Sequence, residues 1–581
     1  MSSTAKLPFK TFWDAVEQRL TTCSVEELRA ILRVMARETL PSERQAFLDK
    51  LQPASAGADA DVLQAVQQED LLADIDDLVQ ELQNEMDNCD EDRYGWQDWD
   101  DEDLLGPYAA FVDPLSILFD RTEAVFDQGN LALARGAYQK LFAVLSLDDD
   151  YGRGVRAADL EEVDIDAACA RYLRAVYETE PLPQRPAILF GQLLEVHPWG
   201  SGRLPMLSDL LDVLPQPLPD RQQFLSDWIA FLRTREGYEA DTWLREAIRL
   251  ASGATGLAEL ARSEGLQRPR AYLDWCAVLT QEAQPRQLLE AAQEALQALP
   301  PALPIRAAIA DYVYQAATTL QQSELITMAR WEAFQAKPTL RRLLELWDAT
   351  PPPSQPQTMR AAADYLQNCL ARPPAYLESL YRQADDLEIP IRVHESALAH
   401  AYLLTGDWQA AYQLSLPAKV LGWSSSTNPQ GLVAAFFLAL LSGKTPVALP
   451  DNLRQLWLWN LHNSVSYSDW KLTPEEVPPA ERLERIYTEL LPRLTLDIAA
   501  QEQLLAWCLE TARQRVEAIV SGQHRDSYDK AAVLISACAE VLRLRGNRQD
   551  GSLLLAEIRN RFPRHRAFLK ELGAAAGKGM L

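Results

Sequence analysis

The sequence predicts an all-α fold of irregular, stacked helical hairpins arranged in two lobes. Three observations predict this class: apolar residues recur at helical spacing, strand-like alternation is almost absent, and short polar or proline-rich breaks separate the periodic segments. In TFWDAVEQRL, for example, Phe12, Val16 and Leu20 are four residues apart and form one apolar face of a helix. The apolar run LVAAFFLALL (432–441) is rich in alanine and leucine, so we expect a buried helix there.

Residues 1–52 are predicted to form a small N-terminal helical unit. Its clearest signal is the capping-box pattern Ser24-Val-Glu-Glu27. In this pattern the Ser24 hydroxyl accepts a hydrogen bond from the amide of residue 27, and the Glu27 carboxylate accepts one from the amide of Ser24. Residues 53–106 follow, and we expect there a turn-rich joint, a long helix of roughly 25 residues, and then an acidic, aromatic linker.

The acidic linker centres on MDNCDEDRYGWQDWDDED (86–103), which holds nine acidic residues, one arginine and three aromatic residues. Because half of its residues carry like charge, self-repulsion opposes compaction, and a solvated linker is the favoured interpretation. A second interpretation is a docking strip in which Tyr94, Trp96 and Trp99 supply contact area and the carboxylates attract a basic partner. We name these three aromatic residues as candidate partner-binding residues.

The same stretch also has part of the spacing of an EF-hand calcium loop. Asp90, Asp92, Gly95 and Asp98 match the first, third, sixth and ninth positions of such a loop. However, Tyr94 stands at the fifth position, where a small oxygen ligand is needed. We therefore assign no metal site here.

Proline-rich breaks divide the rest of the chain. Residues 107–347 are predicted to form a lobe of helical hairpins, and 358–581 a second helical lobe. Between them, 348–357 (DATPPPSQPQ) combines stiff proline runs with polar residues, and we expect a linker there. The end of the second lobe is basic: 541–581 holds nine basic and three acidic residues, a net charge of +6. Ion pairing within the protein is the favoured explanation, and contact with an acidic partner is the alternative.

Two segments resemble the tetratricopeptide helix–turn–helix. They are ESALAHAYLLTGDWQAAYQL (395–414) and QGNLALARGAYQKLF (128–142). The matching positions are Leu398, Ala399, Tyr402, Gly406 and Ala411 in the first segment, and Gly129, Ala134 and Tyr138 in the second. In that family small residues let two helices approach, and glycine closes the turn. No strict 34-residue period links the two segments, so the resemblance implies degenerate hairpins in a TPR-like α-solenoid.

Two further segments resemble the helical part of bacterial SWIM-zinc-finger proteins. They are ARWEAFQAKPTLRRLLELWD (329–348) and FPRHRAFLKEL (562–572). The resemblance implies a stacked helical scaffold. The Cys-x-Cys and Cys-x-His pattern of the zinc finger is missing from this chain, so the resemblance implies no metal or nucleic-acid role.

Several features of the second lobe are candidates for contact with a partner. GWSSSTNPQG (422–431) is a long polar turn between apolar segments, typical of a partner-binding or protease-sensitive loop, although an ordinary connection between helices is the simpler alternative. In LRQLWLWNLHN (453–463) two tryptophans are two residues apart, so one is expected in the core and the other against a neighbouring hairpin or a partner. The candidate partner-binding residues here are Trp408 and Trp423, and the candidate protease-sensitive residues are Ser424, Ser425 and Ser426.

Composition disfavours several classes of function. The formal net charge of −27 opposes direct binding to nucleic acid and to anionic membranes. No apolar run reaches the roughly 20 residues of a transmembrane helix. The seven cysteines are scattered and never form a Cys-x-x-Cys pair, which predicts reduced thiols in a cytoplasmic protein without a zinc site. No phosphate-loop, nucleophile-elbow or zincin motif occurs, so we expect no cofactor and no catalytic residues.

These observations predict a non-enzymatic scaffold or adaptor that binds other proteins. An alternative, by analogy of architecture, is a regulated accessory factor of a bacterial antiviral defence system of the protease-coupled type III CRISPR kind. In that case it would act as a protease substrate or as a sequestering subunit. An enzyme with an unrecognised site is a third hypothesis. The sequence leaves open the partner, the oligomeric state and whether the chain is cleaved.

Overall fold

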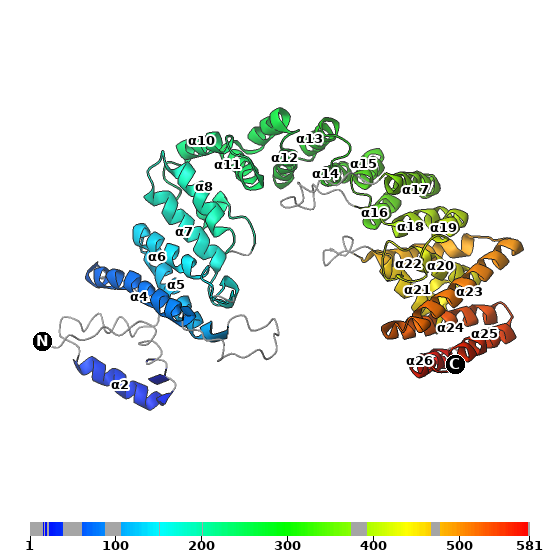
Figure 1. The fold of residues 1–581 in the computed structure, drawn as a ribbon. Helices are drawn as coiled ribbons and strands as arrows, with labels where there is room; N and C mark the ends of the chain where they lie inside the picture. The colour runs from blue at the N-terminus through cyan, green and yellow to red at the C-terminus, as the bar shows by residue number, and fades with distance from the viewer. Residues whose placement is uncertain are drawn as a thin grey trace. The chain divides into compact units, whose positions relative to one another are not determined.

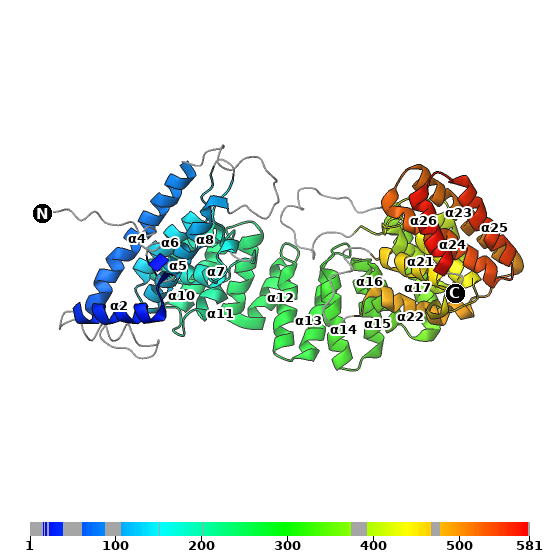
Figure 2. The same ribbon diagram turned by 90° about the horizontal axis from the view of Figure 1, so that it is seen from below.

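A computed structural model describes residues 22–38, 61–87, 106–149, 152–199, 202–372, 392–465 and 477–578, together with residues 16, 18 and 19. Every regular element in these ranges is helical, and the helices pack against one another as hairpins, which confirms the predicted all-α class. The chain forms two compact units, Met1–Gly253 and Ala254–Leu581 (Figures 1 and 2). Residues 88–103 of the acidic stretch, with Tyr94, Trp96 and Trp99, lie outside the described residues.

The described elements of the first unit are all helices. They are α2 (Val25–Glu38), α4 (Asp61–Asp87), η2 (Gly106–Phe111), α5 (Val112–Asp127), α6 (Leu131–Val144), η3 (Ala157–Asp159), α7 (Ile165–Thr179), α8 (Arg185–Val196), α9 (Leu207–Asp212), α10 (Arg221–Leu232) and the first part of α11 (Tyr238–Glu264). The predicted capping box is present at α2: the Ser24 amide donates to Glu27 Oε2 at 2.8 Å, and the Glu27 amide donates to Ser24 Oγ at 3.3 Å. The long helix expected before the acidic stretch is α4.

Successive helices of the first unit pack side by side. Helix α4 contacts α5 and α6, and α6 contacts α7. Gly129, at φ +83°, makes the tight turn between α5 and α6 that the sequence predicts. The small Ala134 is fully buried, and Tyr138 stacks on Phe142 with 6.0 Å between ring centroids. The segment 128–142 therefore forms the turn at Gly129 and most of α6, and α5 is the preceding helix of the hairpin.

The second unit contains the remaining helices. They are the end of α11, α12 (Arg270–Gln281), α13 (Pro285–Ala298), α14 (Arg306–Thr319), α15 (Ser323–Ala336), α16 (Leu340–Ala349), η4 (Pro352–Ser354), α17 (Gln355–Ala371), α18 (Glu395–Thr405), α19 (Trp408–Ser415), α20 (Gln430–Leu441), η6 (Pro446–Ala448), α21 (Asp451–Asn463), α22 (Pro479–Leu490), η8 (Leu491–Arg493), α23 (Ile498–Ser521), η9 (Arg525–Ser527), α24 (Tyr528–Leu544), α25 (Arg548–Arg561) and α26 (Arg566–Lys578). Its first half is a row in which each helix from α12 to α18 contacts the next one (Figures 1 and 2).

The division between the units differs from the predicted lobe boundary. It follows Gly253, whose φ of 58° and ψ of −145° interrupt α11. The proline-rich segment 348–357 instead lies within the second unit, as the end of α16, the short η4 and the first turn of α17. Proline is compatible with the first turn of a helix, because backbone N–H groups there have no acceptor within the helix and the missing N–H of proline costs no hydrogen bond. The prolines there begin elements, and α16 still packs on α17.

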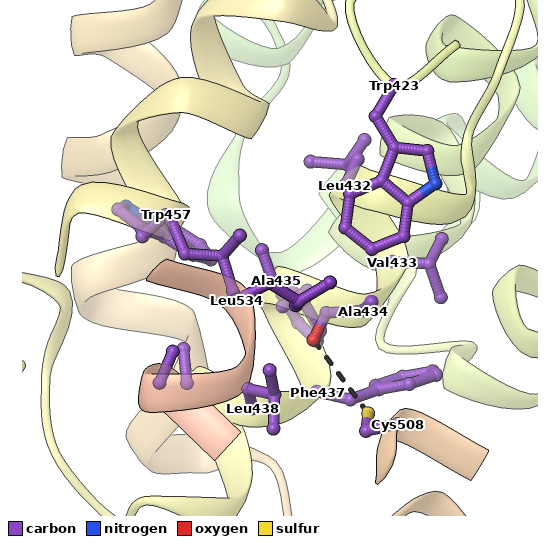
Figure 3. Close-up of a cluster of buried hydrophobic side chains, with 14 of the residues drawn as sticks. Trp423, Leu432, Val433, Ala434, Ala435, Phe437, Leu438, Trp457, Cys508 and Leu534 are labelled. Atoms are coloured by element: carbon purple, nitrogen blue, oxygen red, sulfur yellow. Dashed lines mark hydrogen bonds between the residues drawn. The ribbon is translucent and has the colours of Figure 1, made fainter. Parts of the chain in front are cut away.

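Packing changes character in the second half of this unit. Helix α24 contacts α20, α21, α23, α25 and α26, and nearly all its residues from Ala531 to Leu542 are buried. Helix α20 is buried almost all round, which confirms the buried helix predicted at 432–441. Figure 3 shows Phe437 of α20 beside Cys508 of α23, whose Sγ lies 3.9 Å from the carbonyl oxygen of Ala434. Helices α20 and α24 form the centre of a core that α21 and α23 cover.

The hairpin predicted around Gly406 is also present. Gly406 ends α18 at φ +78°, and the Asp407 side chain caps α19 by accepting from the Ala410 amide at 3.0 Å. At the C-terminal end, Arg545 and Arg561 form ion pairs with Glu502 and Glu517 of α23. Part of the basic segment 541–581 therefore forms ion pairs within the unit, which agrees with the explanation favoured from the sequence. Across the described residues, we find no helix with the length and apolar character needed to span a membrane.

Candidate functional site

A cavity of about 490 Å³ opens in the second unit. Four segments line it: the loop 421–424, helix α21, the last turns of α23, and residues 524–530, which lead into α24. Its size is within the range of pockets that hold a small ligand or a few side chains of a partner. Among the described residues that line it, none is acidic.

The loop before α20 places Trp423 at the cavity. The Trp423 side chain is only 6% exposed and lies beside Leu432 and Val433 (Figure 3). Its Nε1 donates to Gln430 Oε1 at 3.3 Å. Asn428 fixes the loop because its Nδ2 donates to the carbonyl oxygens of Lys419 and Leu421, at 2.7 and 2.8 Å. The polar side chains of this loop therefore form hydrogen bonds with its backbone carbonyl groups and with the Trp423 indole, and they hold the indole in place.

Gly431 makes the close approach of these groups sterically feasible. A Cβ atom at this position would lie 2.8 Å from Cδ2 of Trp423 and closer still to Oδ1 of Asn460 on α21. Such distances are well below van der Waals contact, so only glycine leaves space for the indole and the amide together. Asn460 is fixed in turn because its Nδ2 donates to the Leu456 carbonyl at 2.8 Å.

Arg515 of α23 is the main charged group of the cavity. Its Nη1 donates to the carbonyl oxygen of Val420 at 2.6 Å, and its guanidinium carbon lies 4.2 Å from the ring centroid of Trp423. Arg515 is 7% exposed, yet no carboxylate of the described residues is within ion-pair distance of it. Among the described residues, its Nε and Nη2 have no hydrogen-bond partner. Burial without a counter-charge lowers the pKa of Arg515 to about 10.

The remaining walls combine apolar surface with amides and further positive charge. Ile519 and the ring of Trp459 supply apolar surface, and the Asn463 amide is half-buried. Lys530 is exposed at the rim and, within the described ranges, has no acidic partner. In a chain of net charge −27, this cavity is locally cationic and aromatic. His524, which is exposed like Lys530, also lines the cavity. The arrangement can bind an anionic group.

The structure brings together two segments that the sequence singles out. Trp423 and Ser424 of the polar loop line the same cavity as Trp459. As predicted, the two tryptophans of α21 divide: Trp457 is fully buried in the core and Trp459 is half-buried at the cavity. Trp408 begins α19 and packs against the core outside the cavity.

The serines of this loop differ in their surroundings. Ser424 and Ser425 are exposed, and the Ser425 hydroxyl lies 2.7 Å from that of Thr427. The Ser426 carbonyl accepts from the Ser396 amide at 3.1 Å, which ties the loop to α18. Cleavage by a protease at these serines stays a prediction.

Sequence reasoning missed Arg515, Asn460 and Lys530. A signal for Arg515 is present in the sequence: Cys508, Ala512, Arg515 and Ile519 follow helical spacing on one face of α23, and the other three are buried. An arginine on an apolar face indicates a buried cation that needs compensation.

A second polar cluster lies deep in the same unit. His400 Nδ1 is 2.7 Å from the Tyr487 hydroxyl, and His400 Nε2 is 2.8 Å from Ser464 Oγ. All three side chains are buried, and burial lowers the pKa of His400 to about 3. Because the cluster is closed to solvent and fully hydrogen-bonded, we assign it to the stability of the core.

Comparison with known proteins leaves the site to be interpreted from its geometry. No protein-family model matches the chain. A search of curated proteins found no match to it either.

Proposed function

We propose that the protein is a non-enzymatic scaffold that binds other proteins, and that the cavity beside Trp423 is a contact point for a partner. The observation that supports this proposal most strongly is the combination of Trp423, Trp459 and Arg515 around one cavity. Tryptophan and arginine are the residues most enriched among the energetic centres of protein interfaces. A partner side chain inserted here would be surrounded by aromatic surface and would lose its contact with water.

The helical architecture supports the same proposal. From α12 to α18 each helix packs on the next one, and stacked helix pairs of this kind form extended surfaces on which a partner can lie. A globular core built on α20 and α24 then holds the cavity on well-packed helices. A rigid cavity loses little conformational entropy when a partner binds.

Site-specific photocrosslinking in the native host tests this proposal. A photoreactive amino acid is placed at Ser424, an exposed residue of the cavity rim, and separately at Ser552 of α25, an exposed residue that does not line the cavity. We expect one protein to crosslink at position 424 and not at 552, and the same protein, once purified, to bind the full chain with a measurable Kd in calorimetry. Equal crosslinking at both positions, or no binding by the purified protein, would contradict the proposal.

A further inference from the structure

We propose that the cavity recognises an acidic peptide segment of the partner, and that Arg515 pairs with one Asp or Glu carboxylate of that segment. This inference rests on the proposed function, because it names the chemistry of the protein segment that the cavity accepts. Three features argue for it: the uncompensated charge of Arg515, the free edge of its guanidinium, and the composition of the walls.

The charge of Arg515 is the first feature. A buried cation is normally paired with an acid, since removing a charge from water costs several kcal/mol unless a counter-charge compensates it. Here the guanidinium has a carbonyl oxygen and an indole face as its neighbours, and both compensate only part of the charge. A carboxylate bound in the cavity would complete the ion pair in surroundings that screen it weakly.

The orientation of the guanidinium is the second feature. Nη1 is occupied by the Val420 carbonyl, and Trp423 covers one face of the group. The edge formed by Nε and Nη2 has no hydrogen-bond partner among the described residues, and Arg515 lines the cavity. This edge carries two parallel N–H donors, the geometry that binds both oxygens of a carboxylate. The contacts to Val420 and Trp423 hold it in place before a ligand arrives.

The walls distinguish a carboxylate from a phosphate. Arg515 is the one buried cation among the described lining residues, and it balances the single charge of a carboxylate, whereas a phosphate carries up to two charges. The other two basic residues of the lining, His524 and Lys530, are exposed. Trp459 and Ile519 are apolar, which suits an aliphatic or aromatic residue next to the acid in a peptide. A cavity of about 490 Å³ is also larger than a carboxylate alone requires. Lys530 at the rim adds attraction for an acidic segment as it approaches.

A peptide-display screen against the full-length protein tests the inference. Random dodecapeptides are selected on the wild-type chain, and the best is synthesised with both ends blocked, so that only a side chain can supply the carboxylate. We expect enrichment of Asp or Glu next to an aromatic or aliphatic residue. Changing that acid to its amide is expected to weaken binding about tenfold or more, the usual effect of losing a charge-assisted hydrogen bond.

Variants of the protein identify the site of binding. Arg515→Gln is expected to lose the same factor as the amide peptide, and Arg515→Lys to fall between it and the wild type. Lys530 is exposed, so the substitution Lys530→Glu leaves folding intact. This variant is expected to bind the peptide severalfold more weakly than the wild type, with a strong dependence on salt concentration. The matched control is Arg513→Gln, which removes the same charge from the same helix at an ion pair with Glu557 outside the cavity. It is expected to bind as the wild type does.

The outcomes separate this inference from the proposed function. Selection of peptides without acids, or equal affinity of wild type, Arg515→Gln and Lys530→Glu for the acidic peptide, would overturn the inference while leaving a partner crosslinked at Ser424 intact. Displacement of the peptide by inorganic phosphate at a lower concentration than by acetate would also overturn it in favour of a phosphate site. Acidic peptides bound through Arg515 without a crosslinked partner would support the inference and contradict the scaffold proposal.

Discussion

His400 and Arg515 are two buried basic side chains of the second unit, and they differ in how their hydrogen bonds and charge are satisfied. Both ring nitrogens of His400 have partners, and the Ser464 hydroxyl donates to the Leu461 carbonyl at 2.7 Å. Ser464 Oγ must then accept from Nε2–H, and the Tyr487 hydroxyl donates to Nδ1. A neutral imidazole satisfies this network completely, whereas a protonated ring would have a donor facing the Tyr487 hydroxyl and an uncompensated charge. The neutral form is therefore part of the folded state.

This arrangement predicts a pH-dependent stability. The pKa of His400 is about 3 in the folded protein and about 6.5 in the unfolded chain. Between these values the unfolded chain binds a proton that the folded protein does not, so the free energy of unfolding decreases as pH falls below 6.5, by about 1.4 kcal/mol per pH unit at most. Urea unfolding of wild type and His400→Gln from pH 7 to 4 measures this. The variant is expected to be less stable at pH 7 and to show a shallower dependence on pH; parallel curves would contradict the assignment.

Gly431 gives a second prediction at this scale. Gly431→Ala places a methyl group against Trp423 and Asn460, and overpacking of this kind costs about 1–3 kcal/mol. The control is Gly573→Ala in α26, where an added Cβ meets nothing within 4 Å and alanine favours the helix. Denaturant unfolding is expected to show a loss of stability for the first variant and no loss for the second. Equal stability of Gly431→Ala and wild type would show that the indole and amide move away easily.

Among the helices, a buried carboxylate joins two that are distant in sequence. Glu540 of α24 is 4% exposed and accepts from the amides of Asn452 and Leu453, at 3.3 and 2.9 Å, at the start of α21. These amides have no partner within their own helix. Negative charge at a helix N-terminus is also stabilised by the helix dipole. Glu540 thus fixes the position of α21, the helix that carries Trp459 and Asn460.

Removing the charge of Glu540 tests this role. Glu540→Gln keeps the size of the side chain but loses the charge-assisted hydrogen bonds, and we expect a destabilisation of about 1.5–3 kcal/mol. Glu502→Gln serves as the control, because Glu502 is an exposed acid paired with Arg545 and its loss is expected to cost less than about 1 kcal/mol. Guanidinium unfolding measures the loss of stability in each of the two variants. Similar small effects would mean that Glu540 does not cap α21 in solution.

Local patterns in the sequence predict these elements well and their contacts poorly. Helical spacing indicates α20, and Ser24 with Glu27 indicates the start of α2, because these signals depend on residues a few positions apart. The contact of Glu540 with Asn452 spans 88 residues, and no local pattern encodes it. The same holds for the cavity. Trp423 could be singled out at the start of a polar loop, and Trp459 by its spacing from Trp457, but Arg515 contacts Trp423 only through tertiary packing.

At the scale of the whole molecule, the chain divides into two compact units, Met1–Gly253 and Ala254–Leu581. All the described residues of the cavity, and the described helices that hold it, belong to Ala254–Leu581. The proline-rich segment 348–357, where the sequence predicts a linker between lobes, is inside this unit. Prolines there define helix starts, whereas the division follows a glycine with a non-helical backbone.

This division predicts that the second unit functions alone. A fragment of residues 254–581 is expected to give a helical circular dichroism spectrum, to unfold cooperatively, and to bind the selected acidic peptide within about twofold of the full chain, because it keeps every described residue of the cavity. A matched fragment of residues 358–581, starting at the predicted lobe boundary, would lose α12 to α16 and the core contacts of Leu343 and Leu346. We expect it to be less stable. Equal stability of the two fragments would favour a boundary at the proline-rich segment.

Hydrogen–deuterium exchange of the full chain with its crosslinked and purified partner tests the central claim most directly, because it reports where the partner lies on the whole molecule. We predict slower exchange at 421–430, at 456–463 and at 515–530 when the partner binds, and loss of that protection in Arg515→Gln. Protection confined to other parts of the chain, or protection at these segments that Arg515→Gln leaves unchanged, would contradict the claim that this cavity binds the partner.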